Sequence, residues 1–573
     1  MKPLRSRAWF AGDDETALAN RVALASSGIE VNADADRPVI GIANSASDLN
    51  PCNLPLAELA EAVKDGVRAA GGLPVVFPTM SLGEDLMKPT AMLYRNLLAM
   101  EIEETIRAYP RDGIVILANC DKTVPGAIMG AISTDVPTIV VTAGARAPAV
   151  FRGHRIGTGT DLWRLWDERR TGHLSDADWA ELERCLACGL GACNTMGTAS
   201  TMAIVTEALG LMLPGSSSVA AEDPRRVPLA RDAGARAVEL VREELTPSQI
   251  LTPAAFRNAI RVLHAVGGST NAVIHLAAMA GRVGVPFELD DVRRYGAGVP
   301  VLADIEPSGT GLMQDFDAGG GLPSLMREIA PLLETSTLTI TGAPLADVLD
   351  AAPTPSGAIR TADRPLHEGG AFATVRGSLA PDGALVKTSA ATPALLQHRG
   401  RAVVFRGYDE MRRRVEDPSL EVDADSVLVL TNCGPVGAGM PEWGMVPIPR
   451  KLAEAGVHDM VRVTDARMSG TGFGTVFLHV APEAAIGGPL ALVEDGDTIT
   501  VDVEGGRLDL DVAEDELARR RTRWSAPPAS HLRGWPLLYR EHVMQAPDGC
   551  DLDFLRAPTP AHRRFVEPVV GRS

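Results

Sequence analysis

Three cysteines stand in short polar segments of the N-terminal third: Cys52 in SDLNPCN, Cys120 in NCDK and Cys193 in GACNTMGTAS. Thiolates are ligands for soft metal ions and iron–sulfur clusters. A free cysteine is more often a small buried hydrophobe, but Asp121 and Lys122 directly follow Cys120. Two ionisable residues at the end of an apolar strand indicate chemistry. We therefore predict a metal site at these cysteines, with inert core thiols as the alternative.

The elements around the cysteines alternate between strands and helices. Apolar runs predict strands over residues 37–45, 73–80, 113–120 and 137–144, and helical patterns cover 56–70 and 90–109. Strands separated by helices predict a parallel sheet covered on both faces. In such a sheet the loops beyond the carboxyl ends of the strands converge on the ligand site. Cys52 and Cys120 lie on two of these loops.

From about residue 371 the pattern changes to short β-rich runs separated by Gly, Pro and Asp. They cover residues 373–380, 400–405, 426–432, 459–466 and 497–512, and the last run predicts a hairpin. The fold class expected is thus α/β, with a smaller, mostly β, barrel-like C-terminal domain. With residues 352–370 as a linker, the predicted domains are 1–365 and 366–573.

Composition and missing motifs exclude several function classes. The 573 residues carry a net charge of -18, which disfavours nucleic acid and anionic membranes as partners. No apolar run approaches the ~20 residues that span a bilayer. Seven cysteines, an odd number, do not form a typical disulfide framework, so we expect a cytoplasmic protein. P-loop, GxGxxG, HExxH and GxSxG signatures do not occur in the chain.

Longer segments carry a resemblance to a known family. They are SDLNPCNLPLAELAEAV, SLGEDLMKPTAML, ANCDKTVPGAIMGA, GACNTMGTASTMAI, HAVGGSTNAVIHL, GPVGAGMPEWG and TDARMSGTGFGTVFLHVAPEA. In these, the chain resembles the dihydroxy-acid and sugar-acid dehydratases along nearly its whole length. The opening RSRAWFAGDD is similar to the sugar-acid branch.

The resemblance implies a role for each matching residue. The residues matching the ligands of a 2Fe-2S cluster are Cys52, Cys120 and Cys193. Those matching the ligands of Mg²⁺ are Glu84, Asp121, Lys122 and Glu442, with Lys122 expected to be carbamylated. Ser469 matches the serine base, and Thr471 matches a threonine close to it.

The chemistry implied by the resemblance is the dehydration of a sugar acid. Three thiolates leave one iron with an open position, where it can act as a Lewis acid on a departing 3-hydroxyl. Mg²⁺ prefers oxygen ligands and offsets the charge of an enediolate formed when Ser469 removes the C2 proton. The expected substrate is an aldonate such as arabinonate, xylonate or a hexonate, and the product is its 2-keto-3-deoxy acid. The family also implies a homodimer or homotetramer.

Other interpretations remain open at this point. A dihydroxy-acid dehydratase of branched-chain amino-acid synthesis would use the same residues, and a non-catalytic iron–sulfur or zinc redox sensor would use the cysteines alone. By themselves, Glu84, Glu442 and Ser469 fit ordinary surface or turn positions. Inert thiols are expected at Cys185, Cys188 and Cys433, although Cys188 could compete for the cluster, and core or hydrogen-bonding roles are expected for His264 and His275.

Overall fold

The computed structural model describes residues 3–31, 36–187, 189–528 and 533–557. Its first sheet has four parallel strands in the order β2-β1-β3-β4. Their bounds are Val39–Asn44 for β1, Leu73–Pro78 for β2, Gly113–Leu117 for β3 and Thr138–Val141 for β4. All four strands lie within the ranges predicted from the apolar runs, and the predicted α/β class is confirmed.

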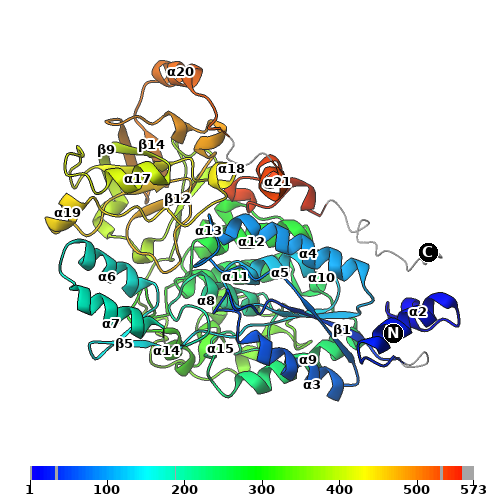
Figure 1. Cartoon of the computed structure of the whole chain (residues 1–573). Helices are drawn as coiled ribbons and strands as arrows, with labels where there is room; N and C mark the ends of the chain where they lie inside the picture. The colour runs from blue at the N-terminus through cyan, green and yellow to red at the C-terminus, as the bar shows by residue number, and fades with distance from the viewer. Residues whose placement is uncertain (1–2, 32–35, 188, 529–532, 558–573) are drawn as a thin grey trace.

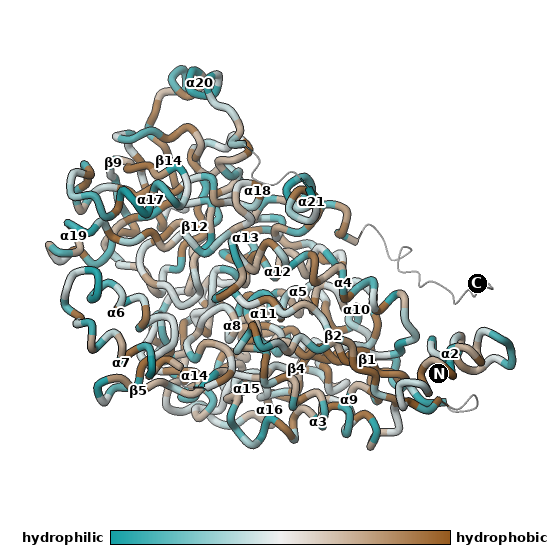
Figure 2. Tube along the Cα trace, in the orientation of Figure 1, coloured by the Kyte–Doolittle hydropathy of each residue, from teal (hydrophilic) through white to brown (hydrophobic). Residues whose placement is uncertain are grey.

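Helices cover both faces of this sheet (Figure 1). On one face α3 (Leu56–Ala69) packs against α9 (Arg226–Glu243), and on the other α4 (Arg95–Ala108) packs against α5 (Thr123–Ile132). The helical pattern predicted from residue 90 begins as a 3-10 turn, η1 (Ala91–Tyr94), before α4. Hydrophobic residues are concentrated along the strands inside this layer (Figure 2).

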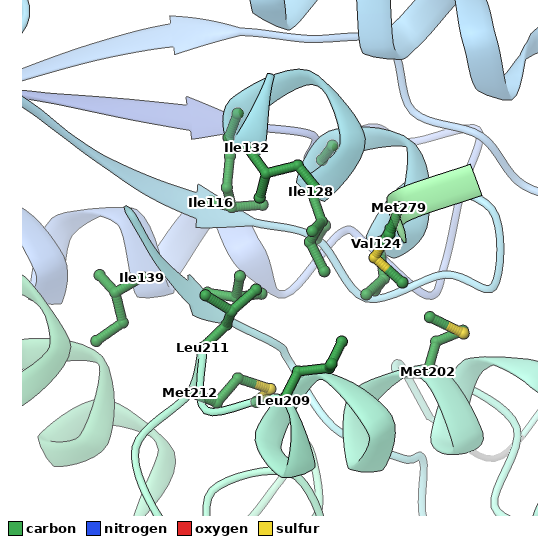
Figure 3. Packing of buried hydrophobic residues seen from close by; sticks show 14 of the residues in the cluster. Ile116, Val124, Ile128, Ile132, Ile139, Met202, Leu209, Leu211, Met212 and Met279 are labelled. Atoms are coloured by element: carbon green, nitrogen blue, oxygen red, sulfur yellow. The ribbon is translucent and has the colours of Figure 1, made fainter. Parts of the chain in front are cut away.

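The core of the first domain lies between the sheet and its helices. Ile128 and Ile132 of α5 lie against Ile116 of β3, and all three side chains are fully buried (Figure 3). A further layer contains α8 (Thr198–Ala208), α11 (Pro253–Ala265) and α12 (Asn271–Val283). Every residue of α8 is buried, so this helix runs through the interior and places its N-terminus inside the molecule.

A small lobe, residues 149–186, is inserted between β4 and α8. It consists of the hairpin β5 (Ala149–Phe151) and β6 (His154–Ile156), followed by α6 (Thr160–Arg170) and α7 (Asp176–Leu186). Its buried apolar residues form a separate cluster. The sequence analysis did not predict this lobe.

The C-terminal sheet has eight strands in the order β14-β13-β9-β10-β11-β12-β8-β7. The strands are β7 (Ala373–Val375), β8 (Gly383–Val386), β9 (Gln397–Arg406), β10 (Val427–Thr431), β11 (Arg462–Thr464), β12 (Val476–Ala481), β13 (Thr498–Asp502) and β14 (Arg507–Leu510). A bridge between Arg376 and Arg507 brings the two edges together. The predicted barrel-like domain is confirmed as a nearly closed sheet, and β13 and β14 form the predicted hairpin.

The end of the chain returns to the first domain. The segment after the barrel contains α20 (Glu514–Arg523), α21 (Gly534–His542) and the turns η7 (Ala546–Asp548) and η8 (Asp553–Leu555), and α21 lies beside α12 and α4 (Figure 1). Arg95 donates to the carbonyls of Gly549 (2.8 Å) and Cys550 (2.9 Å). The predicted boundary between residues 365 and 366 stays a prediction. Among the described helices, none is both long and apolar enough to cross a bilayer.

Candidate active site

The carboxyl ends of parallel strands place the predicted site residues. Cys52 lies on the loop after β1, Glu84 on the loop after β2, and Cys120, Asp121 and Lys122 follow β3. Glu442 comes after β10 and Ser469 after β11, which are parallel neighbours in the second sheet. The site is therefore built where the carboxyl ends of parallel strands from both sheets face each other.

Backbone and amide contacts hold together the first two cysteines of the thiol trio (Cys52, Cys120 and Cys193). The Asn53 side-chain oxygen accepts the backbone N–H groups of Asn119 (3.0 Å) and Cys120 (2.9 Å). The Asn119 amide in turn donates to the carbonyl of Cys52 at 2.8 Å. These bonds join the loop after β1 to the loop after β3, so both thiols are carried by one connected network.

The third cysteine loop is fastened to the loop after β4 by Arg146. The Arg146 backbone N–H donates to Ala192 (2.9 Å), and its guanidinium donates to the carbonyl of Gly191 (3.1 and 3.2 Å). Burial acts to lower the pKa of Arg146. The interactions of its guanidinium with Cys193 and Cys52 act in the opposite direction, and the pKa is raised. A cation thus lies against the thiol trio.

The thiols are electrostatically coupled. A hydrogen bond with Cys52, together with burial, raises the pKa of Cys120 well above its ordinary value. Burial, with Cys52 as the next largest cause, raises the pKa of Cys193 to about 12. Thiols with such pKa values ionise when a metal ion replaces their protons. The donor set, which is soft and largely buried, fits an iron–sulfur cluster held by three thiolates.

The carboxylate trio (Glu84, Asp121 and Glu442) lies beside the thiols. One oxygen from each of its members lies within 4.8 Å of the others, an arrangement that could hold a metal ion. The fully buried Lys122 ammonium lies among them, with Nζ 3.4 Å from Glu84 Oε2 and 3.0 Å from Glu442 Oε1, and it also pairs with Asp121. A cation is therefore accommodated at the centre of the trio.

A second buried cation, Arg467, was not identified from the sequence. It lies 2.9 Å from Glu442 Oε1 and 3.7 Å from Glu84 Oε2. Burial acts to raise the pKa of Glu442, but Lys122 and Arg467 outweigh it and lower this pKa to about 2. Only its place in the matching segment TDARMSG could have drawn attention to Arg467.

The carboxylate trio fits a hard divalent cation. Glu84 Oε2 is buried and accepts no hydrogen bond from any described residue, so a lone pair is available to an ion. Asp121 and Glu442 supply further oxygens of the kind that Mg²⁺ prefers. Lys122 can ligate only if it loses its positive charge, and a carbamate on Nζ would provide both the neutralisation and an oxygen.

Ser469 and Thr471 lie together on a loop that one amide links to the carboxylate trio. The Ser469 and Thr471 hydroxyl oxygens are 2.9 Å apart. The side-chain amide of Asn271, at the start of α12, donates to Glu442 (3.2 Å) and to the carbonyl of Met468 (3.1 Å). Asn271, which the sequence analysis also missed, therefore ties the serine loop to the carboxylates.

The serine loop packs so closely that one position requires glycine. A Cβ atom on Gly470 would lie 2.5 Å from the backbone nitrogen of Thr198 and 2.8 Å from Ser269 Cβ. These two contacts come from the N-terminal ends of α8 and α12. The loop is thus held between two buried helix ends, a constraint that the sequence pattern alone did not reveal.

The remaining candidates have structural surroundings. His264 Nε2 lies 3.0 Å from the carbonyl of Val292, and burial lowers the pKa of His264 to about 4. His275 Nδ1 lies 3.0 Å from Arg95, and burial, followed by the charge of Arg95, lowers the pKa of His275 well below its ordinary value. Cys185 packs in the inserted lobe, and Cys433 is buried in an apolar cluster with residues of β9 and β10. Cys188 lies outside the described residues.

Comparisons with known proteins agree with this arrangement. The dihydroxy-acid/6-phosphogluconate dehydratase N-terminal domain matches residues 37–348, and the C-terminal domain of the same family matches residues 357–550. The chain is 48% identical over 97% of both proteins to a 6-deoxy-6-sulfo-D-gluconate dehydratase of Pseudomonas putida. It is 48% identical over 98% of both to an L-arabonate dehydratase of Azospirillum brasilense. A dihydroxy-acid dehydratase of Acidothermus cellulolyticus is 40% identical over 90% of this chain and 93% of its own.

The family models match both domains, and the relatives align over nearly the full length of the chain. The thiols, carboxylates and hydroxyls of the site agree with the same kind of enzyme. The non-catalytic interpretation of the cysteines does not account for such relatives. The chain belongs to the dihydroxy-acid/6-phosphogluconate dehydratase family and is a hydro-lyase.

Proposed function

We propose that this enzyme dehydrates an aldonate, a sugar acid with hydroxyls at C2 and C3, to the 2-keto-3-deoxy acid. The observation that carries the proposal is that the Asn271 amide donates both to Glu442 of the carboxylate trio and to the carbonyl of Met468, the residue before Ser469. The relatives named as sugar-acid dehydratases are 48% identical, against 40% for the dihydroxy-acid dehydratase. Arabinonate, xylonate and hexonates are the substrates we expect.

Two groups of residues would hold the cofactors. We propose that the thiol trio binds a 2Fe-2S cluster and that the carboxylate trio, with Lys122 as a carbamate, binds Mg²⁺. When bound, the cluster supplies a Lewis acid for the departing 3-hydroxyl, and Mg²⁺ offsets the charge that develops on the substrate. Arg467 would keep Glu442 ionised and hold one of its oxygens in place for such an ion.

The residues of the chain carry the proton chemistry. Ser469 Oγ takes the proton from C2, and the electron pair of that bond forms the double bond between C2 and C3 as the C3–oxygen bond breaks. The C2 proton and the 3-hydroxyl together make the water that leaves, and the enol then becomes the keto acid. Thr471 holds the serine hydroxyl, and Asn271 keeps the serine loop against Glu442.

An anaerobic substrate panel tests this proposal. The protein is purified without oxygen, its visible spectrum is recorded, and aldonates and 2,3-dihydroxyisovalerate are assayed with Mg²⁺ present. We expect at least one aldonate to be turned over with a higher kcat/KM than 2,3-dihydroxyisovalerate. A preference for dihydroxyisovalerate would instead assign the chain to the branched-chain pathway, and a colourless, iron-free protein with full activity would exclude the cluster.

Substitution of the serine tests the base. Ser469→Ala is expected to keep the cluster absorbance and to lose turnover, because the hydroxyl that accepts the C2 proton is gone. Ser419→Ala, at an exposed turn of the same domain, is the matched control and is expected to behave like the unmodified enzyme. Retained turnover in Ser469→Ala would contradict the proposed role.

We further propose that the enzyme works in the cytoplasm as a homodimer or homotetramer. The odd number of cysteines supports a reducing compartment. Light scattering coupled to size-exclusion chromatography measures the oligomeric state.

A further inference from the structure

Trp163 of the inserted lobe makes a hydrogen bond whose direction is fixed by chemistry. Its indole Nε1 lies 3.1 Å from Thr471 Oγ1. An indole N–H can only donate, so the Thr471 oxygen is the acceptor and one of its two lone pairs is occupied. The Thr471 hydroxyl hydrogen is then left to donate elsewhere.

Ser469 is the acceptor available to that hydrogen. The two hydroxyl oxygens are 2.9 Å apart, and among the described residues no other acceptor lies within hydrogen-bonding range of the Thr471 hydroxyl. The Thr471 backbone N–H also points to Ser469 Oγ at 3.4 Å. Once Ser469 has lost its proton it can only accept, so both donors then stabilise the alkoxide, as donors do in an oxyanion hole.

The lobe holds the indole in place from both ends of α6. At its start, Thr160 donates to the carbonyl of Thr471 at 3.0 Å. At its end, Arg170 donates to the carbonyl of Ile448 (2.9 Å) and pairs with Glu416 (2.6 Å) in the C-terminal domain. The helix is therefore clamped against the loop that carries the serine, and the indole N–H has little freedom to turn away.

We propose that Trp163 is a positioning residue that keeps the Thr471 hydroxyl as a donor to Ser469 and thereby stabilises the deprotonated serine. The inference rests on the proposed function, in which Ser469 is the base. Donors in series polarise one another, so the indole acts on the reacting oxygen through the threonine without touching the substrate.

The charged groups around the serine loop come from the site and from the lobe. Arg467 lies two residues before Ser469 and pairs with Glu442, which also pairs with Lys122. On the lobe side are Asp161 and Arg164 of α6, which pair at 2.6 Å; Glu306 interacts with both, and burial raises its pKa to about 7. Trp163→Phe changes none of these charges, so a shift of the pH profile in this variant does not come from a gained or lost charge.

The test compares Trp163→Phe with Trp166→Phe. Trp166 lies on the same helix, is 44% exposed and packs against Trp179, so it is the matched control. In Trp163→Phe we expect kcat to fall about tenfold, which corresponds to about 1.4 kcal/mol, with KM changed less than twofold. The kcat–pH profile should also shift to higher pH, because the deprotonated serine is less stabilised. The isotope effect with a C2-deuterated aldonate should increase, because proton abstraction becomes slower.

Each outcome decides the proposal. An unchanged kcat in Trp163→Phe, a loss confined to KM, or an equal loss in Trp166→Phe would overturn it. If Trp163→Phe lowers the cluster absorbance or the melting temperature, β-(3-benzothienyl)alanine at position 163 replaces only the N–H by sulfur and is held to the same criteria. Turnover in Ser469→Ala would remove the proposed base and this inference with it, whereas an inactive Ser469→Ala beside a fully active Trp163→Phe would remove the inference alone.

Discussion

Two buried cations face three carboxylates in this site, and neither cation has access to water. Lys122 and Arg467 are both 0% exposed. Their charges hold the pKa of Glu442 at about 2, below its ordinary 4.5. Because this pKa is depressed in the folded protein, the associated stabilisation is complete above pH 4.5 and is lost as the pH falls toward 2.

Removal of one of these cations should be costly. For Arg467→Met we expect the free energy of unfolding to fall by about 3–5 kcal/mol, because Glu442 loses its closest guanidinium partner while it stays buried. Urea unfolding of the metal-free protein measures this change. Arg450→Met is the control, since Arg450 pairs with Glu454 at the surface and such pairs contribute about 0–1 kcal/mol. Equal effects of the two substitutions would contradict the expected role.

Arg146 provides a second prediction at this scale. Positive charge and hydrogen bonds near cluster sulfurs raise the reduction potential of an iron–sulfur cluster. With a 2Fe-2S cluster bound, Arg146→Gln should therefore lower this potential and Arg146→Lys should lower it less. Spectroelectrochemical titration measures the potential, and Arg155→Gln, in the inserted lobe and paired with Asp315, should leave it unchanged. A cluster whose potential is the same in Arg146→Gln would show that the guanidinium does not act on the sulfurs.

At the scale of elements, two buried carboxylates hold the segment between β10 and Glu442. Asp465 accepts the backbone N–H groups of Asn432 (3.2 Å), Cys433 (2.9 Å) and Ala484 (3.0 Å). Glu483 accepts those of Val436 (2.8 Å) and Gly437 (2.9 Å). The segment therefore takes its shape from side chains that lie far from it in sequence.

Glu483→Gln tests this support. A Gln amide offers one acceptor oxygen where two oxygens now accept N–H groups, so one donor is left facing another. We expect the free energy of unfolding to fall by about 1–3 kcal/mol. Differential scanning calorimetry detects the change as a lower melting temperature, and Glu504→Gln at the exposed β13–β14 turn should leave it unaltered. No difference between the two variants would argue against the role of Glu483.

Asp465 adds a dependence on pH. Burial and the neighbouring Glu483 raise the pKa of Asp465 from 3.8 to about 7. The folded protein then keeps a proton that the unfolded chain has released, so the contribution of this group to stability falls as the pH rises from 3.8 to about 7. Unfolding measured across that range for the unmodified protein and for Asp465→Asn isolates the contribution, because the Asn variant should lack this slope.

The elements also show what sequence patterns can reveal. The strands from Val39 to Val141 were predictable because strands buried on both faces are continuous apolar runs. The inserted lobe was missed because α6 and α7 are rich in charged residues and bury few side chains. Thiols, carboxylates and the serine came from the family resemblance, whereas Trp163, Asn271 and Arg467 act through contacts between distant segments that periodicity does not encode.

At the scale of the molecule, the last described residues connect the barrel to the first domain. Asp551 forms two bonds with Arg282 of α12, at 2.6 and 3.0 Å, and both side chains are buried. Trp535 donates to the carbonyl of Leu93 at 2.8 Å. The segment after the barrel thus closes the second domain against the first.

Asp551→Asn should weaken this closure strongly. Among the residues that the structure describes, loss of the buried carboxylate leaves Glu103 as the one anionic partner of the Arg282 guanidinium, and we expect a loss of about 3–5 kcal/mol. Asp553→Asn, exposed and paired with His542, should change stability by less than about 1 kcal/mol. Guanidinium chloride unfolding distinguishes the two. A loss in Asp551→Asn no greater than in the control would mean that the segment is held by its apolar contacts alone.

The carboxylate trio draws on both halves of the polypeptide, since Glu84 and Asp121 precede the inserted lobe and Glu442 follows the β10 strand. Binding of the proposed magnesium ion is therefore linked to the association of the two halves, because the ion needs ligands from both. Well above half-saturation, every tenfold rise in the free ion concentration stabilises the associated form by about 1.4 kcal/mol. Removal of the ion should therefore let the two halves separate more often, and limited proteolysis would then be faster in EDTA than in Mg²⁺.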